Sequence, residues 1–166
     1  MNKQPTDLKM LLRDPSLLQT RAYVAGEWID ADDGKTFPVV NPARGDVIAE
    51  VADLSRAEVA RAITSSAAAM KDWAARTGKE RAQVMRKWFD LMMENQDDLG
   101  RILTAEMGKP LPEAKGEIAY GASFIEWFGE EAKRIYGETI PGHMRDKRLT
   151  VIKQPIGVVA SITPWN

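Results

Sequence analysis

The chain has 166 residues, enough to bury one hydrophobic core, and its 23 basic and 24 acidic side chains leave a net charge of −1. This balance argues against a nucleic-acid-binding surface, and no apolar stretch is long enough to cross a bilayer. The absence of cysteine and the single histidine, His143, exclude a thiolate nucleophile, a disulfide and a cysteine- or histidine-rich metal site. The N-terminus carries Asp7 and Asp14 and lacks a continuous apolar segment, so we expect no secretory signal and a cytoplasmic protein.

Residues 1–20 are predicted to form an arm that packs on the body of the protein. The arm is rich in leucine, and Asp14 with Pro15 favours a short helical turn that has proline at its first position. We favour packing over a targeting role for this arm.

Residues 21–51 are predicted to form small strands. Tyr23-Val24 and Trp28-Ile29 flank a turn sequence, which indicates a hairpin. Phe37 to Val40 is a second short strand, placed at a sheet edge because Pro38 cannot donate to a ladder, and Val47 to Val51 follows another turn.

Three helices are predicted next, from their capping residues. Ser55 with Glu58, and Thr77 with Glu80, match the capping box that opens a helix. A third helix, from about residue 97 to 107, is expected to stop at Gly108. The apolar side chains that recur at helical spacing are predicted to pack in the core: Val59, Ile63, Met70, Trp73, Met85, Trp88, Leu91 and Met92.

The longest predicted helix runs from Pro112 to Tyr136, with Gly137 in the left-handed position after its end. At 1.5 Å per residue it would span roughly 35–40 Å. Tyr120 and Phe124 lie four residues apart and therefore share one face of this helix.

The end of the chain is predicted to hold two strands. Residues 139–147 form a loop, after which 148–153 alternates polar and apolar residues as a half-exposed strand does. Ile156 to Ile162 is an apolar, β-branched run typical of a strand buried on both faces, and Pro164 ends it. Ligands of open α/β sheets bind just beyond the carboxyl ends of strands, where Trp165 and Asn166 stand.

Six short stretches of the sequence carry a resemblance to one protein family. They are Glu106-Met107-Gly108-Lys109-Pro110, Phe124-Ile125-Glu126-Trp127-Phe128, Lys133-Arg134-Ile135-Tyr136-Gly137, Ile140-Pro141-Gly142-His143, Val151-Ile152-Lys153-Gln154-Pro155-Ile156-Gly157 and Pro164-Trp165-Asn166. Together they resemble the aldehyde dehydrogenase superfamily, in particular its succinate-semialdehyde dehydrogenase branch. The resemblance runs from about residue 22 to 166 and covers the opening part of such an enzyme.

The resemblance implies an α/β fold of the aldehyde dehydrogenase type, represented by its N-terminal part. That part would comprise small β-hairpins, four main helices, one interface strand and the first strand of a Rossmann-like cofactor domain. The implied divisions are an arm (1–20), the strands and helices of the cofactor-binding domain (21–142), an interface strand segment (143–155) and the first cofactor-domain strand (156–166).

The resemblance also implies a chemistry. Such enzymes oxidise a small aldehyde, here succinate semialdehyde, through a cysteine thiohemiacetal, with NAD or NADP accepting the hydride and a glutamate as general base. The cysteine and the glutamate lie downstream in the family and are expected to be missing here. Asn166 matches the oxyanion donor, and Ile162, Thr163, Pro164, Trp165 and Asn166 match the cofactor wall. Tyr120 and Phe124 line the substrate tunnel or pack in the core, and we leave both alternatives open.

Two functions remain open at this point. The chain is the N-terminal fragment of an aldehyde dehydrogenase that is homo-oligomeric at full length, or it is a non-catalytic helical interaction module that retains the scaffold. The reading frame after codon 166 would discriminate between them. Either way, we expect the isolated chain to be inactive and to have no metal, nucleic-acid or membrane partner.

Overall fold

The structure is a computed structural model, and it describes residues 7–164. The described part begins within the N-terminal arm. Two 3₁₀ turns, η1 (Leu8–Leu11) and η2 (Pro15–Leu17), form the arm, and the Asp14 carboxylate accepts a hydrogen bond from the Ser16 amide at 2.9 Å. The predicted turn at Asp14 and Pro15 is confirmed. Leu8 is buried, and η1 contacts the third helix of the fold.

Two antiparallel hairpins follow, as predicted. Strands β1 (Ala22–Val24) and β2 (Glu27–Ile29) pair so that Tyr23 faces Trp28, with 5.0 Å between their ring centroids. Strands β3 (Thr36–Val40) and β4 (Val47–Ala52) form the second pair. Each pair is a two-stranded sheet, so the edge position predicted for Pro38 is confirmed.

Helices α1 (Arg56–Ala75) and α2 (Gly78–Glu94) begin where the capping signals predicted them. Both capping boxes are complete, because the Ser55 and Thr77 side chains accept from the backbone while the N3 glutamates reach back. Helix α3 (Gln96–Met107) ends at Gly108, whose φ of 82° is left-handed and therefore favours glycine.

Helix α4 (Leu111–Glu131) is shorter than predicted, because it ends at Glu131 and not at Tyr136. After Glu131 the chain makes tight turns in which the Lys133 amide donates to Glu130 and the Arg134 amide to Glu131. The two basic side chains fold back onto the same two glutamates, at 2.8 and 2.9 Å. The helix is therefore about 31 Å long.

The role predicted for Gly137 is also wrong. Its φ is not positive, so it does not occupy the left-handed position after the helix. It lies against the backbone instead, where an added Cβ would come within 2.2 Å of the Val151 carbonyl oxygen. Glycine is required here by close approach of two chain segments rather than by helix termination.

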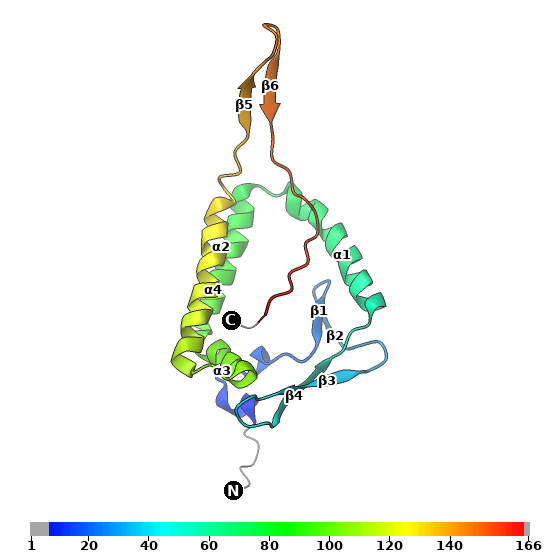
Figure 1. Cartoon of the computed structure of the whole chain (residues 1–166), viewed down its shortest axis with the longest axis vertical. Coiled ribbons are helices and arrows are strands. Elements are labelled where there is room, and N and C mark those ends of the chain that lie inside the picture. Colours follow the sequence, from blue (N-terminus) through cyan, green and yellow to red (C-terminus); the bar gives the residue numbers. More distant parts are fainter. Residues whose placement is uncertain (1–6, 165–166) are drawn as a thin grey trace.

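A third hairpin lies beyond α4. Strands β5 (Glu138–Pro141) and β6 (Arg148–Val151) are antiparallel, and the hairpin projects from the rest of the chain (Figure 1). The strand predicted over residues 148–153 is confirmed for its first four residues. The loop predicted over 139–147 is partly wrong, because its first residues pair with β6 and complete a ladder that local sequence did not reveal.

The strand predicted from Ile156 to Ile162 does not form among the described residues. This stretch belongs to no helix or strand pair, and Ile156 and Ile162 are 96% and 95% exposed. A strand buried on both faces needs neighbouring strands and covering helices. No segment of residues 7–164 supplies that ladder.

The core lies between α2, α3 and α4. Helix α4 packs along both α2 and α3, and Leu103, Ala114 and Ala122 are buried there. The predicted core stripes are only partly correct, because the larger side chains of several of them remain exposed. The exposed members are Val59, Ile63, Trp73, Trp88 and Leu91.

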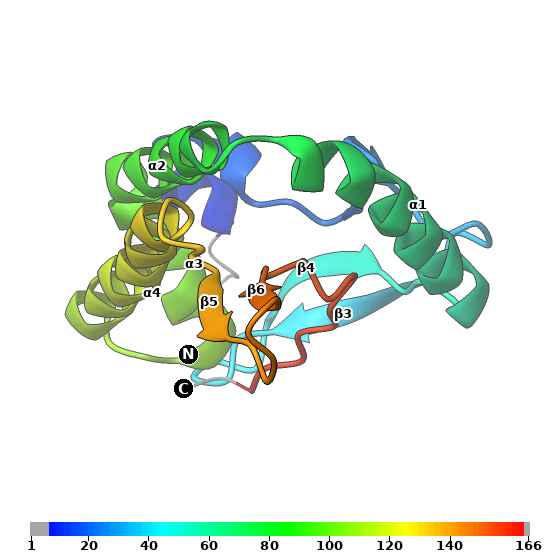
Figure 2. The same cartoon turned by 90° about the horizontal axis from the view of Figure 1, so that it is seen from above.

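The helices and strands form an open frame. Helix α1 makes one side and the α2–α4 pair makes the other, as both views show (Figures 1 and 2). Strands β3 and β4 lie at the end of the frame opposite the β5–β6 hairpin, and the chain after β6 runs back between the two sides (Figure 1). Large apolar side chains therefore remain exposed on both sides of the frame, among them Val59 and Ile63 of α1 and Trp127 and Phe128 of α4.

Candidate functional site

The predicted cofactor wall lies at the end of the segment that runs between the two sides of the frame. Ile162, Thr163 and Pro164 are all exposed. Trp165 and Asn166, including the predicted oxyanion donor, lie outside the described residues. The exposed residues Ile162 to Pro164 do not by themselves enclose a cofactor. Their assignment stays a prediction.

Upstream in the same segment, the chain lies beside α1. Gly157, Val158 and Val159 line one side of an open cleft of about 540 Å³. The other side comes from the C-terminal half of α1 and the residue that follows it: Ser66, Ala69, Met70, Asp72, Trp73 and Arg76. The residues that sequence analysis placed on a sheet strand thus lie next to an amphipathic helix, and this proximity was not predicted.

Tyr120 and Phe124 meet on the surface of α4. Their rings form an edge-to-face pair with 4.9 Å between centroids, and the side chains are 60% and 46% exposed. A cavity of about 680 Å³ begins at Phe124 and continues along the helix past Trp127 and Phe128. The pair is exposed in this chain rather than packed in its core, and its role in a substrate tunnel stays a prediction.

A half-buried carboxyl group, Glu106, stands near the end of α3. Burial raises the pKa of Glu106, since the charged form loses hydration there. Nearby in sequence, Lys109 forms an ion pair with Glu117 of α4, and both side chains are largely buried. Sequence analysis used residues 106–110 for the resemblance but gave Glu106 no role. A glutamate at the end of a helix, followed by a glycine stop, would not have signalled this burial.

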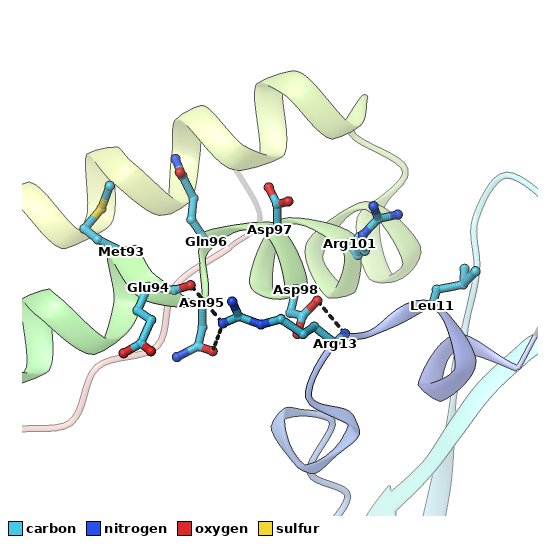
Figure 3. Close-up of a pocket in the computed structure, with 9 residues that line it drawn as sticks. All are labelled: Leu11, Arg13, Met93, Glu94, Asn95, Gln96, Asp97, Asp98 and Arg101. Carbon is cyan, nitrogen blue, oxygen red and sulfur yellow. Dashed lines mark hydrogen bonds between the residues drawn. The ribbon is translucent and has the colours of Figure 1, made fainter.

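Asp98 holds the N-terminal arm, in a cavity of about 270 Å³ (Figure 3). Asp98 is only 3% exposed. Its carboxylate accepts hydrogen bonds from the backbone amides of Arg13 at 3.0 Å and Asp14 at 2.8 Å. The Arg13 guanidinium donates to the Glu94 carbonyl and the Asn95 side chain, each at 3.2 Å. The Arg13 and Asp14 amides hold the pKa of Asp98 below its usual range. Both oxygens of the Asp98 carboxylate are used as acceptors for the arm, so we assign Asp98 no catalytic role.

Glu58 plays a similar part at the start of α1. It is buried and accepts the Ser55 amide at 2.6 Å and the Asp32 amide at 2.7 Å. Hydrogen bonds from the Ser55 hydroxyl, the Ser55 amide and the Asp32 amide lower the pKa of Glu58. The capping signal predicted the first contact, whereas the bond to Asp32 comes from tertiary structure.

In the part of the chain that the structure describes, no group of three or more histidine, cysteine or acidic side chains is placed to hold a metal ion. Among those same residues, no helix has both the length and the apolar character that a membrane crossing requires.

Comparison with known proteins places these observations in context. A sequence profile described as "Aldehyde dehydrogenase family" matches residues 28–166. The chain is 62% identical, over 95% of its length, to a glutarate-semialdehyde dehydrogenase of Pseudomonas aeruginosa. It is 58% identical, over 95% of its length, to the succinate-semialdehyde dehydrogenase [NADP(+)] of Escherichia coli K12. It covers 32% and 33% of these two proteins, about a third of their length.

A solved structure agrees with the sequence matches. The crystal structure of succinate-semialdehyde dehydrogenase from Burkholderia pseudomallei superposes with a TM-score of 0.86 and 54% identity. The match covers 88% of this chain and 30% of that one. The open frame is therefore similar to one part of a larger α/β protein.

Proposed function

The chain belongs to the aldehyde dehydrogenase family, and we propose on that premise that it supplies the N-terminal third of an NAD(P)-dependent semialdehyde dehydrogenase. The observation that carries the proposal is the match to two curated relatives, both of which are named for semialdehydes of short dicarboxylic acids. The substrate class is accordingly a short aliphatic aldehyde with a carboxylate at its other end. Succinate semialdehyde and glutarate semialdehyde are its first candidates.

Three groups of residues would carry the chain's share of the reaction. The Asn166 side-chain amide would donate a hydrogen bond to the oxyanion that develops when the aldehyde carbon becomes tetrahedral. Ile162, Thr163, Pro164 and Trp165 would form one wall for NAD or NADP, which when bound provides a hydride acceptor. Tyr120 and Phe124 would restrict the approach of the aldehyde.

The nucleophile has to come from elsewhere. The 166 residues contain no cysteine, so the thiolate that would attack the aldehyde is not among them. We therefore expect the 166-residue chain by itself to oxidise neither semialdehyde with either cofactor. In this proposal its role is to hold and orient, while bond formation needs the remaining segment of such an enzyme.

A chimera tests this function. The chain is joined to the part of the P. aeruginosa relative that follows the segment matched by this chain. Formation of NADH or NADPH is then measured with succinate semialdehyde, glutarate semialdehyde and an uncharged aldehyde of similar length. We expect turnover and a preference for the two carboxylated aldehydes. A chimera that folds and binds cofactor but is inactive would favour the non-catalytic interaction module instead.

A further inference from the structure

A cavity of about 280 Å³ lies where the N-terminal arm, the turn between β3 and β4, the end of α3 and the start of α4 meet. These elements come together at the end of the frame opposite the β5–β6 hairpin (Figure 1). Leu8 and Asn41, which line the cavity, are only 6% and 8% exposed. Packing among residues of this chain therefore forms the cavity, and its volume is close to the lower limit of about 300 Å³ for small-molecule sites.

Aliphatic side chains form much of the wall of this cavity. They come from the arm, from β4 and from both helices, and they are Leu8, Leu11, Ile48, Ala105 and Leu111. Such a wall favours an aliphatic group, because apolar surface is removed from water when the group enters. A charged group held against the same wall would lose hydration without gaining a partner.

One residue of the wall, Thr104 of α3, has a buried hydroxyl group without a hydrogen-bond partner. Its Oγ1 atom is buried and makes no hydrogen bond within residues 7–164. A threonine inside a helix can donate to the carbonyl four residues earlier, and Thr64 of α1 does so to Ala60 at 3.0 Å. Leaving a buried polar group unpaired is destabilising, so Thr104 is available to pair with a group inside the cavity.

Asn41 adds a second polar group that is almost completely buried. Its side-chain oxygen accepts the Ala43 amide at 2.9 Å and the Arg44 amide at 3.2 Å, which fixes the turn after β3. Since the oxygen is used in the turn, the Nδ2 group is the part of Asn41 that remains for the cavity. Within the described residues this nitrogen donates to no acceptor.

Arg101 of α3 brings a positive charge to the cavity. It lines both this cavity and the polar one beside Asp98, and no dashed contact reaches it in Figure 3. The neighbouring carboxylates are already used, because Asp98 accepts the arm amides and Asp97 pairs with a lysine of α4. The other arginine at the cavity, Arg44, is held by both oxygens of Asp46 at 2.8 Å. Among residues 7–164, Arg101 is therefore the cation of this cavity that has no carboxylate.

We propose that this cavity binds a short aliphatic monocarboxylate. The carboxylate accepts hydrogen bonds from the Arg101 guanidinium, the Thr104 hydroxyl and the Asn41 amide, and the aliphatic part lies against Leu8 and Leu111. All three polar groups are donors, so they fit an acceptor, and a single unpaired cation fits a single negative charge. The inference goes beyond the proposed function and does not rest on it.

The walls and the charge also indicate which small molecules fit poorly. A neutral alcohol would leave the arginine unpaired, and inorganic phosphate would leave the aliphatic wall uncovered. A dicarboxylate would place its second charge against that wall. These three classes of compound are therefore the comparison ligands for the test.

Butyrate is the probe, and isothermal titration calorimetry measures its binding to the 166-residue chain and to the chimera described above. 1-Butanol, succinate and inorganic phosphate are titrated under the same conditions. We expect saturable binding of butyrate at one site per chain, at least about tenfold tighter than each of the other three. The measurement needs no turnover, so an inactive chimera that binds butyrate would contradict the proposed function and leave this proposal standing.

Three variants test the residues that carry the proposal. Arg101→Gln should weaken butyrate binding by at least about tenfold, because the charge-assisted hydrogen bonds are lost. Lys9→Gln removes the same charge from an exposed residue of the arm and should change the affinity by less than about twofold. Thr104→Val keeps the shape of the side chain and should weaken binding by about three- to tenfold. It should not lower the stability of the ligand-free chain, because the hydroxyl has no partner there.

Each other outcome counts against the proposal. Titration without saturation would leave the cavity to water and overturn the site. Binding of 1-butanol, phosphate or succinate as tight as that of butyrate would overturn the ligand class. Equal effects of Lys9→Gln and Arg101→Gln would mean that long-range charge, and not contact, attracts the anion. A Thr104→Val variant that is destabilised but binds butyrate normally would give Thr104 a structural role and remove it from the site.

Discussion

Asp98 joins two segments that are distant in the sequence, the arm and α3. We predict that Asp98→Ala destabilises the attachment of the arm by about 1.5–3 kcal/mol, because two backbone donors lose a charged acceptor. Hydrogen exchange of residues 8–18 measures this release. Asp97→Ala is the matched control, because the Asp97 carboxylate is exposed and paired with Lys115. It should lower the free energy of arm attachment by less than about 1 kcal/mol. Equal effects of the two changes would contradict this role for Asp98.

The same carboxylate makes the attachment dependent on pH. The pKa of Asp98 is lower in the folded chain than in the unfolded chain, so its contribution is complete above the unfolded value and is lost as pH falls through the folded value. We expect protection of the arm to decrease at the acidic end of a pH series. In Asp98→Asn this decrease should be absent, and a wild-type arm whose protection is constant with pH would count against the assignment.

The next prediction tests the oxyanion-donor role proposed for Asn166. In the active chimera, Asn166→Ala should lower kcat and kcat/KM together by about 10²–10³, because the lost donor stabilises the transition state more than the ground state. The affinity for cofactor should stay nearly unchanged, and burst-phase kinetics separates the two effects. An unchanged burst rate with weakened cofactor binding would place Asn166 in the cofactor wall alone.

At the scale of elements, the two capping boxes allow a direct comparison. Ser55 caps α1, which lacks packing partners, whereas Thr77 caps α2, which packs along α4. Thr77→Ala should lower the free energy of unfolding of the α2–α4 unit by about 1 kcal/mol. Ser55→Ala should accelerate exchange within α1 and leave that unfolding free energy unchanged.

Chemical denaturation followed by helix signal, together with site-resolved exchange, measures both effects. Thr77→Ser preserves the hydroxyl and is the control that should restore stability. If Ser55→Ala reduced the cooperative unfolding free energy as much as Thr77→Ala, α1 would belong to the same cooperative unit. The independence inferred for α1 would then be wrong.

At the scale of the whole molecule, the frame leaves a large apolar area exposed. The unpaired backbone of residues 156–162 and the exposed faces of α1 and α4 are surfaces that promote association. We predict that the isolated chain self-associates. Size-exclusion chromatography with light scattering should show species larger than a monomer.

A paired substitution checks the cause of this association. Ile156→Lys with Ile162→Lys should raise the monomer fraction, since charge on an unpaired segment opposes strand pairing. Lys153→Arg, which keeps the charge of a neighbouring exposed residue, should have no effect. A wild-type chain that elutes as a monomer and melts cooperatively would contradict the prediction.

Local interactions are what the sequence by itself determined. The starts of α1 and α2, the stop at Gly108 and the first two hairpins depend on hydrogen bonds and backbone preferences within a few residues, so capping and turn residues predict them. The family was also readable from the order of short motifs, because these are contiguous in the chain. Asn166 and Trp165 were singled out by their place after an apolar run, and their roles stay predictions.

Tertiary structure alone decided the features that depend on distant segments. Gly137 is needed because β6, fourteen residues further along the chain at Val151, passes close to its backbone. The bonds from Arg13 and Asp14 to Asp98 join residues that no local pattern connects. The apolar face of α1 and the run from residue 156 to 162 carry a clear pattern for burial, yet burial requires a partner surface. A sequence specifies which faces seek burial, and only the assembled chain determines what covers them.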